Sequence, residues 1–138
     1  MTCGAEYFLD ELNERQIPRF LIIESKNKDL DFYFENFGIN KWFSHEKIIC
    51  VDNIVPGKPD KSFYDKVVHS ISLSVKNCIV LENSISGIYA AKEAGIGEII
   101  VITSEDKKYT FEYMSEIDDV ITNFHEFNRL LLRPDFWR

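Results

Sequence analysis

Polar residues that suit a phosphate group follow three apolar runs of strand length. They are Glu24-Ser25-Lys26-Asn27 after the first run, Gly57-Lys58-Pro59-Asp60 in the segment after the second, and Glu82-Asn83-Ser84 after the third. Ligands of open parallel sheets bind at the carboxyl ends of the strands, so we expect Lys58, Ser25 and Glu82 to converge at one edge. Lysine charge, hydroxyls and helix N-termini suit a phosphate dianion, and a carboxylate can hold Mg2+ through oxygen.

The elements that must position these residues alternate between strand and helix. Nearly continuous apolar runs, as expected of strands buried on both faces of a parallel sheet, occupy residues 19–23, 47–51, 78–81 and 99–102. A short run at 119–121 predicts an edge strand before a last helix. Apolar residues with helical spacing fall at residues 5–15, 30–37, 62–71 and 86–94, and Gly38 and Gly95 are placed to end two of these helices. The pattern predicts an α/β fold of three Rossmann-like layers, with a mainly parallel sheet and helices on both faces.

Composition limits the class of protein. With 138 residues, 45% hydrophobic and 28% charged, residues 1–138 are expected to form a single domain. A net charge of -7 and a pI near 5.0 argue against nucleic acid as a partner. No apolar run approaches the roughly 18 residues of a membrane span, and no secretory signal pattern is visible, so we expect no membrane partner and a cytoplasmic location. Cys3, Cys50 and Cys78 lie far apart and are expected to be reduced.

Three segments resemble motifs of the haloacid dehalogenase (HAD-like) superfamily, in particular its beta-phosphoglucomutase-like phosphatase branch. Residues 79–95, IVLENSISGIYAAKEAG, resemble the fourth motif, in which an apolar strand is followed by E-D-S, two residues, G-I and an Ala-rich helix ending in A-G. Gly57-Lys58-Pro59-Asp60, with Phe63-Tyr64 soon after, resembles the third motif. Residues 17–27 resemble the second-motif strand and its Ser-Lys-Asn continuation. The resemblance covers nearly the whole chain, beginning at the predicted helix 5–15.

The resemblance implies a hydrolase of the phosphatase or phosphomutase type that uses magnesium and acts on a small phosphorylated molecule. Lys58 matches the catalytic lysine that neutralises the nucleophile and the phosphoryl group. The implied phosphate-binding residues are Ser25, Lys26, Asn27 and Lys58, and the implied Mg2+ ligands are Glu82 and Asn83.

The sequence departs from the family pattern at several positions, and in the family all of these positions serve phosphoryl transfer. The family's chemistry begins with a D-x-D motif on the first strand, whose leading aspartate attacks phosphorus. The only such string here, Asp29-Leu30-Asp31, lies inside a predicted helix. We therefore expect residues 1–138 to be a truncated core without the first strand and without the cap domain. Ile23 replaces the second-motif hydroxyl residue, and Asn83 replaces the second acidic residue of the fourth motif, so magnesium binding should be weak or absent.

Two functions remain open. The chain is either an enzyme core completed by another chain, an oligomer partner or an upstream segment, or a non-catalytic phosphate-binding or protein-interaction module. Because Ile23 and Asn83 lie within the residues present, truncation does not explain them, and we expect the isolated chain to be inactive. Glu82 is equally well explained as a metal ligand or as an acidic residue at a helix N-terminus, and Ser84 and Ser86 are expected to be helix caps. The gap left by the first strand can close by direct pairing of the neighbouring strands or be filled by a strand from another chain. We expect direct pairing of residues 20–24 with residues 78–82.

Overall fold

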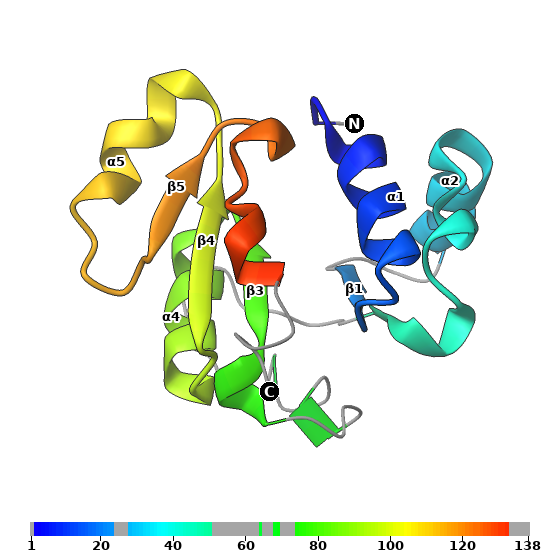
Figure 1. Cartoon of the computed structure of the whole chain (residues 1–138), viewed down its shortest axis with the longest axis horizontal. Coiled ribbons are helices and arrows are strands. Elements are labelled where there is room, and N and C mark those ends of the chain that lie inside the picture. Colours follow the sequence, from blue (N-terminus) through cyan, green and yellow to red (C-terminus); the bar gives the residue numbers. More distant parts are fainter. Residues whose placement is uncertain (1, 24–27, 51–63, 65–67, 70–73, 133–138) are drawn as a thin grey trace. The chain divides into compact units, whose positions relative to one another are not determined.

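The computed structural model describes residues 2–23, 28–50, 64, 68, 69 and 74–132, without the side chains of residues 28–30 and 50. The chain divides into two compact units, Met1–Val55 and Pro56–Arg138, and each is described by itself (Figure 1).

The first unit contains two helices and two short parallel strands. Helix α1 spans Ala5–Glu14, strand β1 Leu21–Ile23, helix α2 Lys28–Phe37 and strand β2 Ile48–Cys50. Leu21 lies opposite Ile48 and Ile23 lies opposite Cys50 in the strand pair. The apolar face of α1 is buried, as its helical spacing predicts, and α2 ends immediately before Gly38, which has a positive φ.

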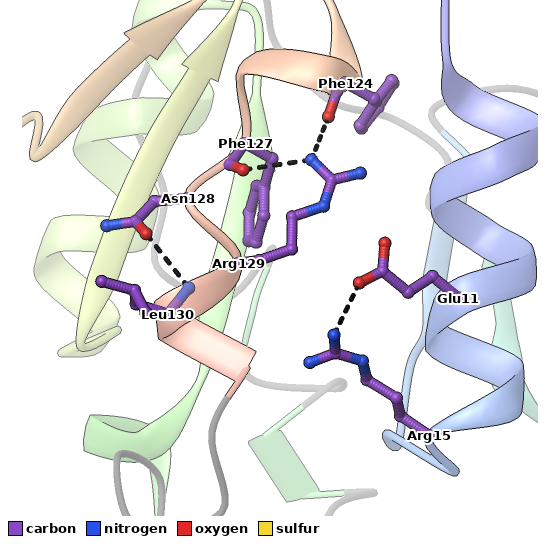
Figure 2. A network of polar contacts seen from close by, with 7 residues as sticks. All are labelled: Glu11, Arg15, Phe124, Phe127, Asn128, Arg129 and Leu130. Atoms are coloured by element: carbon purple, nitrogen blue, oxygen red, sulfur yellow. Dashed lines mark hydrogen bonds and ion pairs between the residues drawn. The ribbon is translucent and has the colours of Figure 1, made fainter.

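A polar network fixes α1 against the segment that follows α2. The indole Nε1–H of Trp42 donates to Asp10 Oδ1 over 2.7 Å. The guanidinium of Arg19 donates to the Trp42 carbonyl over 2.8 Å and to Asn13 Oδ1 over 2.7 Å. On the same helix, Arg15 pairs with Glu11 one turn away at 2.9 Å (Figure 2). Since Trp42 is buried, its indole N–H needs such an acceptor.

The second unit contains three parallel strands in the order β3-β4-β5 (Figure 1). Strand β3 spans Ile79–Glu82, helix α4 Ile85–Ala94, strand β4 Glu98–Ile102, helix α5 Lys108–Glu112 and strand β5 Asp119–Ile121. The middle of β4, residues 99–101, is at most 1% exposed, which confirms the prediction of a strand buried on both faces. Gly95 ends α4 with φ 84°, a left-handed conformation that glycine adopts without steric cost.

The chain after β5 folds back in two short 3-10 turns, Phe124–Glu126 and Arg129–Leu132. Arg129 Nη1 donates to the carbonyl oxygens of Phe124 and Phe127 (Figure 2). Phe127 and Leu132 are buried, at 4% and 5% exposure. Between β5 and Leu132 the structure has these two 3-10 turns and no α-helix, and any last helix after the edge strand would lie outside the described residues.

Most of the strands and helices predicted from the sequence are present in the structure. Every predicted strand is present, all described strand pairs are parallel, and β5 lies at the edge of its sheet. Of the helix predicted at 62–71, Tyr64, Val68 and His69 are helical and the other residues lie outside the described part. Direct pairing of residues 20–24 with residues 78–82 is not among the strand pairs of the described residues. No helix in the described ranges is long and apolar enough to cross a membrane.

Replacing Glu98 with glutamine is expected to stabilise the protein at neutral pH. Burial, and next the charge of Asp118, raise the pKa of Glu98 at the start of β4. The folded state therefore favours the protonated carboxyl, and the charged form at pH 7 lowers stability. In Glu98→Gln, Tm should rise by about 1–3 °C at pH 7, a small gain because the side chain is partly solvated.

The pH dependence gives the control. As pH falls through the raised pKa of Glu98, the wild-type carboxyl becomes neutral and the two proteins should converge in Tm. Glu112 is an exposed carboxylate on α5, so Glu112→Gln should keep a Tm close to that of wild type at every pH, with no difference at pH 7 that disappears in acid. Equal behaviour of the two substitutions across the pH range would contradict the assignment.

Candidate functional site

The predicted site residues divide between described and undescribed parts of the chain. Glu82 and Asn83 are described, whereas the predicted phosphate-binding set, Ser25, Lys26, Asn27 and Lys58, lies outside the described residues. The expected convergence of Lys58 and Ser25 with Glu82 therefore stays a prediction.

Glu82 is the last residue of β3 and lies opposite Val101 on β4. Its exposed fraction is 9%, which makes it the only charged side chain that is buried among the residues described. The sequence placed Glu82 just after the strand, and the structure extends the strand by one residue to include it. A buried carboxylate is costly unless hydrogen-bond donors surround it.

Three donors surround the Glu82 carboxylate. The phenol hydroxyl of Tyr64 donates to Oε2 over 2.5 Å. The backbone N–H of Asn83 donates to Oε1 over 3.1 Å, and the Ser84 hydroxyl lies 3.4 Å from the same oxygen. Tyr64 is itself only 2% exposed. Sequence reasoning noted an aromatic residue after G-K-P but assigned it no partner, because nothing in the sequence links positions 64 and 82.

The turn that follows Glu82 also forms the start of α4. Ser84 is the N-cap, and its hydroxyl oxygen accepts the backbone N–H of Gly87 over 3.1 Å, as predicted. Ser86 is not a cap, because it lies inside the first turn of the helix. A Cβ on Gly87 would fall 2.2 Å from the Glu82 carboxyl carbon, so this position accepts only glycine while Glu82 keeps its place.

The other described residues that bear on catalysis supply no further phosphate-binding or metal-binding group. Ile23 ends β1 with 7% of its surface exposed and presents only an aliphatic side chain. Asp29 and Asp31 lie within helix α2, as expected. Among described residues no group of three or more His, Cys, Asp or Glu side chains could hold a metal.

The described residues alone do not fit a Mg2+ site. Mg2+ requires six oxygen ligands in near-ideal octahedral geometry. Glu82 offers a carboxylate whose two oxygens already accept hydrogen bonds, and Asn83 adds one exposed side-chain amide. That set offers a Mg2+ ion at most one carboxylate, and both of its oxygens are already engaged by protein donors.

Comparison with known proteins identifies the family. The family described as haloacid dehalogenase-like hydrolase matches residues 1–101, and the chain belongs to this family. Members of the family typically depend on Mg2+. A crystal structure of a HAD hydrolase of family IA, variant 3, from Entamoeba histolytica superposes with a TM-score of 0.83 at 27% identity, covering 95% of this chain and 58% of that one.

Curated relatives include phosphatases of small molecules. Validoxylamine A 7'-phosphate phosphatase of Streptomyces hygroscopicus subsp. limoneus is 24% identical over 123 residues, which cover 89% of this chain and 55% of the relative. The phosphorylated carbohydrates phosphatase of Thermotoga maritima is 26% identical over 111 residues, covering 79% and 50%. The chain thus spans about half the length of these relatives.

Removing the Ser84 cap should destabilise the protein. Ser84→Ala leaves the Gly87 N–H without its acceptor, and loss of an N-cap hydroxyl costs about 0.5–2 kcal/mol. Urea denaturation should show a lower midpoint with an unchanged slope. Ser86→Ala, inside the first turn, is the matched control and should be close to neutral because alanine favours helix. Equal losses in the two variants would refute the capping role.

Proposed function

We propose that residues 1–138 form the phosphate-handling core of a HAD-like phosphatase or phosphomutase of the beta-phosphoglucomutase-like branch, and that this chain alone does not hydrolyse phosphate esters. On this proposal the residues constitute one core domain without the nucleophile strand and without a cap. Family membership and the names of the relatives support a small phosphorylated molecule as the ligand.

The proposal that the chain is inactive rests mainly on the position and burial of Ile23. It stands where the family pattern requires a hydroxyl, at the carboxyl end of β1, and it is buried with 7% of its surface exposed. A buried aliphatic side chain donates no hydrogen bond to a transferring phosphoryl group. Electrostatic and hydrogen-bond stabilisation supplies most of the catalysis of phosphoryl transfer, so this loss falls on the chemical step itself.

The phosphate-binding residues of the proposed site are Ser25, Lys26, Asn27 and Lys58. Lys58 supplies the positive charge that a phosphate dianion requires, and the neighbouring hydroxyl and amide groups supply donors. The family pattern assigns Glu82 and Asn83 to a Mg2+ ion, and on our proposal this chain binds that ion weakly or not at all.

A second candidate function is a non-catalytic phosphate-binding or protein-interaction module. The arrangement around Glu82 favours it, because the carboxylate that the family pattern assigns to metal is buried and already hydrogen-bonded to protein donors. Such a module keeps the fold and its anion-binding residues and needs no nucleophile.

A phosphatase assay with an aryl phosphate and Mg2+ tests the proposal. The wild-type chain should show no turnover above a buffer control, while inorganic phosphate should still bind and Lys58→Ala should abolish that binding. The double variant Ile23→Thr, Asn83→Asp should bind phosphate with Mg2+ several-fold more tightly than wild type, because it regains one donor and one hard anionic ligand.

The matched control for the strand position is Ile22→Thr. Ile22 points to the other face of β1, so its hydroxyl should not improve phosphate binding. Wild-type turnover that disappears with a chelator and in Lys58→Ala would contradict the inactive assignment. Absence of phosphate binding in every variant would contradict the phosphate-handling core.

A further inference from the structure

We propose that Tyr64 and Glu82 form an internal clamp that holds the turn between β3 and α4, and that Glu82 serves as an acceptor for protein donors in place of binding Mg2+. The clamp consists of Tyr64, Glu82, Asn83 and Ser84, with Gly87 beneath the carboxylate. The inference goes beyond the proposed function, because it holds whether or not phosphate binds.

The hydrogen bond between Tyr64 and Glu82 is short and shielded from water. The 2.5 Å separation between Tyr64 Oη and Glu82 Oε2 lies in the range of O–H···O⁻ bonds, which are shorter and stronger than bonds between neutral groups. Tyr64 is 2% exposed and Glu82 9% exposed, so water competes little for either group. Each group would be costly to bury alone, and each supplies the partner that the other needs.

Most acceptor positions of the Glu82 carboxylate are already occupied by protein donors. A carboxylate has about four lone-pair positions, and three donors already approach those of Glu82. Mg2+ loses its waters reluctantly and usually keeps several of them when a protein binds it. About one position therefore remains on a carboxylate that is only 9% exposed, where a hydrated ion has little access.

The turn also carries little charge. Two adjacent carboxylates here would repel each other, and a cation between them would relieve that repulsion. Asn83 is neutral, and its backbone N–H donates to Glu82 over 3.1 Å. The single remaining charge is therefore balanced by N–H and O–H dipoles and by the N-terminus of α4, without an ion.

A double-mutant cycle in urea tests the clamp. Tyr64→Phe removes the strongest donor and should raise the equilibrium constant for unfolding about tenfold or more. Glu82→Gln should also destabilise the protein. In the double variant the unfolding equilibrium constant should rise by much less than the product of the two single-variant increases. Tyr113→Phe and Glu93→Gln, both at exposed positions, are the matched controls and should stay near wild type. Multiplicative single effects would overturn the clamp.

Metal titration separates the clamp from a metal site. Mg2+ titrated calorimetrically into wild type and Glu82→Gln should give either no binding to both or equal dissociation constants. A tenfold or greater loss of affinity in folded Glu82→Gln would overturn the structural role and leave the proposed phosphate-handling function in place.

A spectroscopic signature covers the case in which Glu82→Gln does not fold. A buried tyrosine hydroxyl proton in a short bond to a carboxylate exchanges slowly and should give a separate downfield proton resonance. That resonance should vanish in Tyr64→Phe, persist in Tyr113→Phe and stay in place when Mg2+ is added. Its absence from wild type, or its loss on addition of Mg2+, would overturn the proposal.

Discussion

The constraint on which the second unit depends is the burial of one negative charge at the end of β3. The carboxylate of Glu82 has 9% of its surface exposed, and the free energy of leaving such a group without partners would consume much of the stability of a small domain. The residues around Glu82 meet this need for hydrogen-bond partners and space. A tyrosine must reach Oε2, the backbone must turn so that the next N–H meets Oε1, and a glycine must follow where the carboxylate contacts the helix.

This constraint explains in physical terms why the fourth-motif pattern is recognisable here. Ser84 satisfies an orphan N–H of α4, Gly87 makes room for a carboxylate, and Gly95 ends the helix in a left-handed conformation. None of these roles involves a substrate. Residues that make the family visible in a sequence are therefore partly the residues that fold its central turn, and their presence is evidence of fold before it is evidence of catalysis.

The sequence predicted those features that local rules determine. Continuous apolar runs identified all five described strands, and Gly38 and Gly95 marked the ends of α2 and α4 because a left-handed residue at a helix end is a local requirement. Helix α5 was missed because five residues carry too little periodicity to register. The bond between Tyr64 and Glu82, and the bond between Trp42 and Asp10, join residues 18 and 32 positions apart, and no local pattern encodes such pairs.

The two departures from the family pattern differ from the matches in what they do for the fold. On the assignment that we propose, Glu82, Ser84 and Gly87 each carry a structural role, so replacing any of them would break a bond or create a clash. A hydroxyl at position 23 would serve only a phosphoryl group, whereas the buried isoleucine contributes apolar surface to the first unit at about 25 cal/mol per Å². A second carboxylate at position 83 would add repulsion that a nearby cation would relieve. On the proposal that this chain does not hydrolyse phosphate esters, stability accounts for isoleucine at position 23 and asparagine at position 83. Stability also accounts for the retention of Glu82, Ser84 and Gly87.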